Sequence, residues 1–250
     1  MRSSATADKQ RLNDMKKYVS ESWGKDSLAM LLMMIERGET PDEVVFYDTG
    51  VEFKAIYDTR DKVLPILASH GIKYTELQPE QSFIYNMLDR LVNERSGGTH
   101  YGYSWCGGVC RWGTSQKIKA LKAHTFDGLD YVGIAYDEPH RLTKNYRPNK
   151  RFFLYDNEVT EADALQYCYD RGFYWEENGI KLYEILDRVS CWCCGNKNLK
   201  ELKNIFLYLP EYWERLKALQ SRTERPYRRR EGITIHQLEK RFINEINKRA

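Results

Sequence analysis

The sequence predicts an α/β fold in which a parallel β-sheet is flanked by helices. Two observations support this prediction. Short apolar segments typical of strands alternate with longer helical segments, and 250 residues suffice for one large α/β domain or two small ones. Strands that alternate with helices at this spacing form right-handed β-α-β units and therefore a parallel sheet. With 42% apolar residues, the chain can bury a substantial core.

The alternation is clearest in the first 135 residues. Predicted strands occupy residues 17–20, 44–47, 73–77 and 131–135, and predicted helices occupy 28–35, 55–70, 83–93 and 114–123. The helix at 28–35 is almost entirely apolar and ends before Gly38, as expected of a buried helix with a glycine stop. Pro65 is expected to kink or divide the second helix. Thr160 and Asp163 begin a further helix that extends to about residue 171.

The sequence after residue 198 changes character, and we predict a helical, basic C-terminal extension at 199–250. Residues 201–250 carry 12 lysines and arginines against 7 acidic residues, a net +5, whereas residues 1–200 carry 27 against 29, a net −2. Helices are expected at 202–209 and 211–219. The last helix opens with Thr234 and Gln237 and places Ile235, Leu238, Phe242 and Ile246 on one face. This helix is expected to pack on the domain or on a protein partner, a second copy included.

Composition narrows the possible partners. The overall charge is 39 − 36 = +3, too close to neutral for a strong polyelectrolyte binder. No apolar run approaches the length of a membrane span, and the start lacks an apolar signal core. We therefore expect a cytoplasmic protein without a membrane partner.

One basic segment stands out within the extension. Residues 222–230 hold five arginines and one aromatic residue, namely Arg222, Arg225, Arg228, Arg229, Arg230 and Tyr227. Arginine beside an aromatic residue suits contact with a nucleic-acid backbone. A solvated linker is an equally favoured interpretation of such a charge run.

A glycine-lysine turn lies between the first strand and the buried helix. Its residues are Ser22, Trp23, Gly24, Lys25, Asp26 and Ser27. Gly24 allows the backbone to approach an anion, the first amides of the helix point at that anion, and Lys25 adds a positive charge. The spacing differs from that of the P-loop and of the dinucleotide-binding glycine motif. This pattern predicts a phosphate site, and an ordinary turn with a solvated lysine is the alternative.

This turn resembles the pyrophosphate-binding loop of the adenine nucleotide alpha-hydrolase superfamily, and within it the phosphoadenosine phosphosulfate (PAPS) reductase-like family. Three further segments match in order: 45–53, Arg111-Trp112 with Lys117 and Lys119, and 131–141. The resemblance implies a Rossmann-like nucleotide-binding domain at 1–198. It further implies that ATP or a related adenine nucleotide, with Mg²⁺, is bound by the turn together with Asp48, Thr49, Gly133 and Arg141. Lys25 and Asp26 are the predicted catalytic residues. Besides Asp48, the pair Asp137 and Glu138 is a candidate for holding Mg²⁺ through water, or a set of ordinary turn residues.

The sequence also departs from the family pattern at two places. Trp23 replaces the second glycine of the loop. No cysteine follows Cys194, whereas sulfonucleotide reductases carry a catalytic cysteine near the C-terminus. Without that nucleophile, reduction of PAPS by this chain alone is disfavoured.

Five of the six cysteines fall in two groups about eighty residues apart: Cys106 and Cys110, and Cys191, Cys193 and Cys194. Such pairs can supply four thiolates to one zinc ion or one [4Fe-4S] cluster. The predicted ligands are Cys106, Cys110, Cys191 and Cys194. Cys193 either replaces Cys191 or is a nearby thiol. Buried free thiols are the alternative for both groups, and Cys168 is assigned to the core.

The cysteine arrangement resembles the cluster ligation of assimilatory adenosine phosphosulfate reductases and of the sulfur-transfer component of DNA phosphorothioation. This resemblance favours an iron–sulfur cluster over zinc. It leads to three hypotheses of function. The first is an ATP pyrophosphatase that adenylates an acceptor and transfers sulfur. The second is a catalytically reduced nucleotide sensor or DNA-associated regulatory subunit. The third, weaker hypothesis is a reductase whose catalytic cysteine comes from another chain.

Overall fold

The computed structural model describes residues 15–106, 108–110, 113–142 and 148–248. The chain forms two compact units, each assembled from separate stretches of sequence. The first unit consists of Met1–Asp48, Ala55–Leu77 and Ile118–Tyr174, and the second of Thr49–Lys54, Gln78–Lys117 and Trp175–Ala250. These boundaries differ from the division at residue 198 that the change in composition indicates.

A five-stranded sheet forms the centre of the first unit and confirms the predicted α/β class. Its strands are β1 (Lys17–Glu21), β2 (Glu43–Tyr47), β3 (Lys73–Leu77), β6 (Leu129–Val132) and β7 (Lys150–Arg151). The spatial order is β3-β2-β1-β6-β7, and every neighbouring pair is parallel. Because the chain moves from one side of β1 to the other between β3 and β6, the carboxyl ends of β1 and β6 form the topological switch point. Ligands of open parallel sheets bind at this point.

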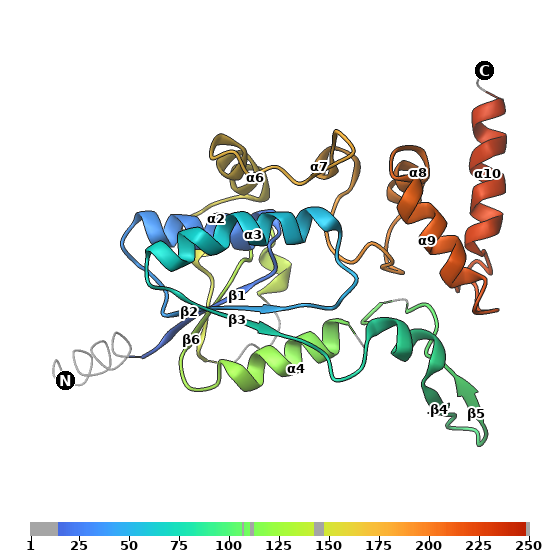
Figure 1. Cartoon of the computed structure of the whole chain (residues 1–250), viewed down its shortest axis with the longest axis horizontal. Coiled ribbons are helices and arrows are strands. Elements are labelled where there is room, and N and C mark those ends of the chain that lie inside the picture. Colours follow the sequence, from blue (N-terminus) through green and yellow to red (C-terminus); the bar gives the residue numbers. More distant parts are fainter. Residues whose placement is uncertain (1–14, 107, 111–112, 143–147, 249–250) are drawn as a thin grey trace. The chain divides into compact units, whose positions relative to one another are not determined.

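Helices cover both faces of this sheet. They are α2 (Lys25–Glu36), α3 (Lys54–Ser69), α4 (Thr114–His124), α5 (Phe153–Asp156) and α6 (Glu161–Asp170), with a 3₁₀ turn η2 (Pro139–Arg141). Helices α2 and α3 lie on one face and α4 on the other (Figure 1), and α6 packs on α2. Helix α3 runs continuously through Pro65, so the expected division there does not occur.

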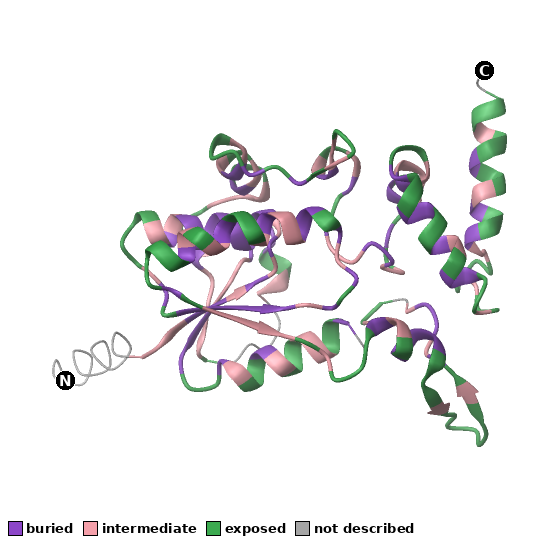
Figure 2. Cartoon of the chain, in the orientation of Figure 1, coloured by how far each residue is buried: buried purple, intermediate pink, exposed green. Residues whose placement is uncertain are grey.

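The core of the first unit is centred on β2 and α2. Every residue of β2 is buried, and buried residues follow α2 for most of its length (Figure 2). On the opposite face, Leu121 of α4 packs against Tyr18, Val45 and Tyr47 of the sheet. Because most of α2 is buried, the helix does not need a face of polar residues toward solvent. This explains its nearly uninterrupted run of apolar residues.

A buried carboxylate lies at the amino end of the sheet. Glu43 is fully buried, and its oxygens lie 2.6 Å from Lys16 Nζ, 2.8 Å from His124 Nε2 and 3.2 Å from Lys73 Nζ. Thr75 donates a further hydrogen bond to it at 2.5 Å. These donors hold the pKa of Glu43 down at about 2 although burial acts in the opposite direction.

The second unit is mainly helical. It contains the π-helix η1 (Tyr85–Asp89), the short strands β4 (Leu91–Asn93), β5 (Thr99–Tyr101), β8 (Glu176–Glu177) and β9 (Ile180–Lys181), and the helices α7 (Leu182–Ile185), α8 (Leu199–Tyr208), α9 (Pro210–Gln220) and α10 (Ile235–Asn247). The helix predicted at 83–93 is confirmed only over 83–89, because residues 91–93 form a strand. Gly97 and Gly98 have positive φ values of 85° and 103°, and the turn that they form lets β4 pair with β5.

Contacts between side chains from distant parts of the sequence hold this unit together. Trp105 Nε1 donates to Gln220 Oε1 at 3.1 Å, and Ser104 Oγ lies 2.8 Å from Thr223 Oγ1. The last helix docks through Trp213 and Phe242, whose rings lie 5.8 Å apart, and through an ion pair from Lys203 to Glu245. These contacts explain why segment 78–117 groups with the C-terminal helices. Every helix in the described ranges is too short or too polar to cross a bilayer.

Candidate functional site

The glycine-lysine loop lies at the switch point of the sheet. It leaves the carboxyl end of β1 after Glu21 and enters α2 at Lys25, so the amides at the start of α2 face this end of the sheet. Gly133, the first residue after β6, packs directly on the loop. A Cβ at Gly133 would lie 2.8 Å from the amide nitrogen and 2.9 Å from the Cα of Ser27. The structure therefore brings Gly133 to the loop, as the sequence predicts, and leaves no space there for a side chain.

Lys25 is buried although it is charged, with 8% of its surface exposed. Its Nζ lies 2.7 Å from Asp26 Oδ1 and 3.5 Å from Glu161 Oε1 at the start of α6. Within the loop, Ser22 Oγ and Ser27 Oγ are 2.9 Å apart. A buried cation beside a helix N-terminus is suited to bind an anionic group.

The surroundings of Asp26 disfavour its charged carboxylate form. Burial raises its pKa to about 6, the positive charge of Lys25 opposes this shift, and the negative charges of Glu161 and Glu138 add to it. Burial and like charges thus outweigh the bond to Lys25. Strongly shifted carboxyl groups are typical of functional sites.

The shift gives a prediction about stability. The folded state binds the Asp26 proton more tightly than the unfolded state, so Asp26 costs stability as the pH rises from 3.8 to about 6. In Asp26→Asn this cost is absent. We expect the difference in free energy of unfolding between the variant and the wild type to grow in favour of the variant by about 2–3 kcal/mol from pH 4 to pH 7. Denaturant unfolding at both pH values measures it, and a constant difference would contradict the assigned shift.

The remaining predicted nucleotide ligands are distributed over several segments. Arg141 pairs with Glu138, whose charge reaches Asp26. Asp48, at the end of β2, accepts a hydrogen bond of 2.7 Å from the Tyr57 hydroxyl. Asp137 accepts one of 3.0 Å from the Glu161 amide and thus supports the first turn of α6. These groups all belong to the first unit.

Thr49 belongs to the second unit, where it lies in a different chemical setting. Its hydroxyl donates to Glu52 Oε1 at 2.9 Å and lies 3.7 Å from Cys191 Sγ. Cys191 Sγ is also 3.7 Å from Glu52 Oε1. The structure therefore brings Thr49 together with a cysteine that the sequence assigns to the metal site.

The two cysteine groups meet in the second unit. A cavity of about 470 Å³ is lined by Cys106, Cys110, Cys191, Cys193 and Cys194. Gly108 and Asn196 exchange two hydrogen bonds of 2.8 and 2.7 Å, which join the loops that carry the two groups. Gly195 packs on Cys106, because a Cβ at that position would lie 2.5 Å from the Cys106 carbonyl oxygen. The predicted convergence of the two cysteine groups thus occurs.

The thiol groups that line the cavity are of the donor type that zinc and iron–sulfur clusters take. The described side chains include no group of three or more His, Cys, Asp or Glu residues arranged around one metal position. These five described cysteines are not joined by disulfides, and Gly113 donates its amide to Cys110 Sγ at 3.2 Å, a type of bond that tunes iron–sulfur sites. Burial raises the pKa of Cys191, Cys193 and Cys194. A bound cation has the opposite effect, because it stabilises thiolates.

Comparison with known proteins supports the interpretation of the first unit. Residues 16–127 match the phosphoadenosine phosphosulfate reductase domain. The chain carries a PAPS reductase domain. Its family is part of the adenine nucleotide alpha-hydrolase superfamily, and it is an enzyme family in the broad sense. The matched residues include the loop, Asp48, Thr49, Cys106 and Cys110.

A longer archaeal protein extends the similarity beyond the PAPS reductase domain. The uncharacterized protein MJ0066 of Methanocaldococcus jannaschii is 28% identical over 211 residues. The aligned part is 79% of this chain and 40% of that protein. The chain thus spans less than half the length of this relative.

Trp23 distinguishes this PAPS reductase domain from the family pattern. It has a φ of 58°, a conformation that favours glycine, and its fully buried ring contacts Phe46 and Tyr74 with centroids 6.1 and 6.0 Å away. Packing of the indole therefore compensates for backbone strain of about 1–3 kcal/mol. Trp23 thus adopts a backbone conformation that glycine favours although it carries a large side chain.

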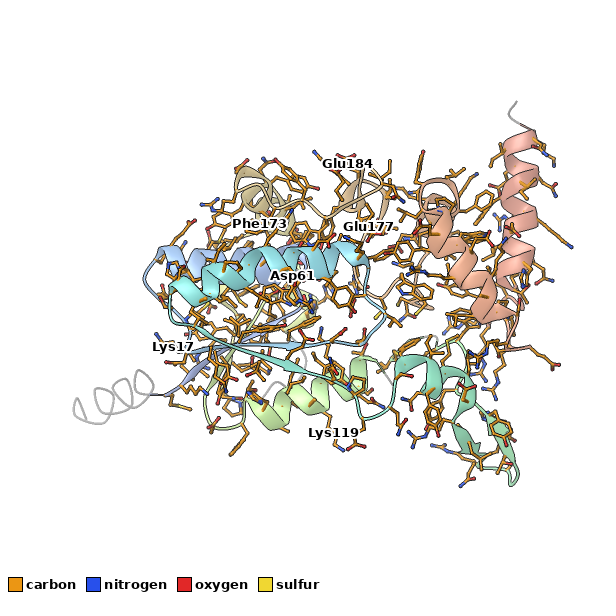
Figure 3. All side chains as sticks on the ribbon, viewed as in Figure 1. Lys17, Asp61, Lys119, Phe173, Glu177 and Glu184 are labelled. Atoms are coloured by element: carbon orange, nitrogen blue, oxygen red, sulfur yellow. The ribbon has the colours of Figure 1, made fainter. Side chains whose placement is uncertain are left out.

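Sequence reasoning missed Glu21, the residue before the loop. It is fully buried and bonds to the loop amides. The available signal was an acidic residue between the predicted strand at 17–20 and the glycine-lysine turn. The matching segment Arg111-Trp112 lies outside the described residues, and Lys119 is exposed on α4 (Figure 3).

Several residues of the basic segment 222–230 already make contacts within the protein. Arg222 pairs with Asp89 at 2.7 Å and Arg228 pairs with Glu231. Tyr227 is 3% exposed, and its hydroxyl donates to the Cys194 carbonyl oxygen. Its ring is therefore unavailable for stacking on bases. The exposed residues of the segment include Arg225, Arg229 and Arg230.

Proposed function

We propose that the first unit binds ATP through loop 22–27 and that the protein cleaves ATP between the α- and β-phosphates, transferring the adenylyl group to an acceptor oxygen. The observation that carries this proposal is the buried Lys25 at the start of α2, in a loop located at the switch point and closed by Gly133. The acceptor oxygen bonds to the α-phosphorus while the bond to the bridging oxygen breaks. The electron pair of that bond leaves with pyrophosphate.

Lys25 and the loop amides perform the electrostatic part of this step. Negative charge increases on the bridging oxygen as pyrophosphate leaves, and fixed donors that face this charge lower the barrier. Because Lys25 is buried, its charge is screened less than that of a surface lysine. A sulfur nucleophile then displaces AMP from the adenylated acceptor.

Mg²⁺ is the proposed companion of the bound triphosphate. When bound, it neutralises phosphate charge and polarises the phosphoryl oxygens. Asp48 is the candidate that holds it through water, since its carboxylate lies at the end of β2 and is oriented by Tyr57. The other candidates, Asp137 and Glu138, already bond to the Glu161 amide and to Arg141.

We also propose that the cysteine cavity holds a [4Fe-4S] cluster through Cys106, Cys110, Cys191 and Cys194. Five thiols on one cavity and an amide donor to Cys110 support this assignment. Zinc is the alternative metal. Cys193 is the alternative to Cys191, because it is 2% exposed and electrostatically coupled to Cys110 and Cys194. When bound, an iron–sulfur cluster supplies a site that transfers electrons or binds sulfur.

The metal proposal predicts loss of iron in a cysteine variant. Protein purified without oxygen should be brown, with about four irons per chain and broad absorption near ~400 nm. In the double variant Cys110→Ser and Cys194→Ser, iron should fall below about one per chain, because two thiolate ligands are removed. Cys168→Ala, which alters a buried cysteine of the first unit, is the matched control and should keep its iron. A colourless wild type with one zinc per chain would overturn the cluster.

The acceptor is proposed to be a nucleic acid, bound through exposed arginines. Arg225, Arg229 and Arg230 are exposed and suited to phosphate contacts, which need no aromatic stacking. Pyrophosphate assays with ATP, Mg²⁺ and added nucleic acid test the function as a whole. Release supports the enzyme. ATP binding without release supports a sensor, and sulfite release from PAPS with thioredoxin supports a reductase.

A further inference from the structure

Glu21 places a carboxylate against the hydrogen-bond donors of loop 22–27. It is the last residue of β1, and its side chain is fully buried. Its Oε1 accepts hydrogen bonds from the Ser22 amide at 2.9 Å and from the Trp23 amide at 2.7 Å. The Ser27 hydroxyl donates to the same oxygen. Three donors of the loop are therefore directed onto one carboxylate oxygen.

These donors, two backbone amides and a hydroxyl, are of the types that bind phosphate groups in proteins. A loop before a helix binds phosphate through backbone amides and hydroxyls, and a carboxylate is an oxyanion with the same preference. Glu21 and a phosphate at this loop therefore compete for donors. They also repel each other, because two negative groups close together in a partly buried site interact strongly.

The surrounding charges increase this effect. Lys25 Nζ is already within 2.7 Å of Asp26 and 3.5 Å of Glu161, and Glu138 is close enough to raise the pKa of Asp26. The cation of the loop is thus shared among carboxylates. An incoming anion gains less from Lys25 than it would gain from a lysine without acidic neighbours.

We propose that Glu21 is an internal anion that weakens the binding of nucleotide phosphates and of pyrophosphate at loop 22–27. This inference rests on the proposed function only in that the loop is the phosphate site. Glu21 keeps the loop ordered in the ligand-free protein and favours the release of pyrophosphate after cleavage. It is an affinity-determining residue and takes no part in bond formation.

The variant Glu21→Gln separates charge from shape. Glutamine has the same size, and its carbonyl oxygen can replace Glu21 Oε1 as an uncharged acceptor for the loop donors, which all end on that one oxygen. We expect Glu21→Gln to bind inorganic pyrophosphate and ATP about tenfold or more tightly than the wild type in calorimetry. Glu36→Gln is the matched control, because Glu36 lies at the other end of α2, and its affinity should be unchanged.

Opposite results would overturn the inference. If Glu21 served only to hold the loop in shape, Glu21→Gln would bind pyrophosphate equally or more weakly. Glu21→Ala provides a second neutral variant if glutamine prevents folding, and equal or weaker binding by it has the same meaning. Pyrophosphate release from ATP by the wild type reports the proposed function separately. If the variants bind pyrophosphate more tightly but the wild type releases no pyrophosphate from ATP, this inference holds and the proposed enzymatic function is wrong. If binding is unchanged and the wild type does release pyrophosphate, the proposed function holds and this inference is wrong. Absence of binding in all forms overturns both.

Discussion

Lys25→Ala is expected to lower the rate of pyrophosphate release from ATP by about 10²–10³-fold. Lys25 is the buried cation of the loop, and its Nζ faces the carboxylates of Asp26 and Glu161. Without it, the developing charge on pyrophosphate is stabilised only by the loop amides and the proposed Mg²⁺. Weaker binding of ATP should accompany the slower release, since the same charge attracts the bound triphosphate.

Lys119→Ala is the matched control for this prediction. Lys119 is exposed on α4 (Figure 3), so its removal eliminates one positive charge without disturbing the loop. The control should retain nearly the full rate of pyrophosphate release. Circular dichroism should show that both variants are folded. A folded Lys25→Ala variant with more than about a third of the wild-type rate would exclude the role assigned to Lys25.

Glu43→Gln is expected to destabilise the first unit by about 3 kcal/mol at pH 7. Glu43 is fully buried, and its pKa is lowered from 4.5 to about 2 by its bonds to Lys16, Thr75, His124 and Lys73. A lowered carboxyl pKa contributes stability that is complete above pH 4.5 and disappears as the pH falls through about 2. The difference between variant and wild type should therefore shrink over this range.

Amide hydrogen exchange of β1 and β2 measures this effect within the first unit. The variant should exchange these amides faster at pH 7 by roughly two orders of magnitude, which corresponds to the expected loss of stability. Glu39→Gln, an exposed carboxylate of the same unit, should leave exchange unchanged. Equal protection in the Glu43 variant and the wild type would show that the ion pairs only offset the cost of burying the charge.

The regular elements of the first unit were predictable because their signals are local. The strand at 73–77 and the helix after Thr160 agree with the structure, and Thr160 and Asp163 form the predicted capping box. A capping box depends on two residues three positions apart, so a single sequence is enough to recognise it. Parallel pairing followed from the alternation of strands and helices.

The division into units was not predictable because it depends on distant contacts. Trp105 and Gln220, which bond in the second unit, are separated by 115 residues. The helix predicted at 83–93 extends too far, since it ends at residue 89, for a related reason. The pairing of β4 with β5 across Gly97 and Gly98 outweighs the helical preference of the segment.

The candidate site was predictable in its residue types and only partly in its geometry. Gly133 lies against Asp26 and Ser27, in the loop that also contains Gly24 and Lys25. The role of Glu21 depends on which donors surround a buried carboxylate, and composition cannot reveal this. Tyr227 was expected to be available to nucleic acid, yet its hydroxyl bonds to the Cys194 carbonyl oxygen. A sequence shows which side chains are present, but it cannot show which of them already bond to other groups of the protein.

The position of bond cleavage in ATP tests the central proposal most directly. Wild-type protein, purified without oxygen, is incubated with Mg²⁺, nucleic acid and ATP labelled at either the α- or the γ-phosphate. We predict that the α-label appears in AMP or in an adenylated acceptor and the γ-label in pyrophosphate. A γ-label recovered as inorganic phosphate beside α-labelled ADP, or ATP that is bound and stays intact, would contradict an adenylating enzyme.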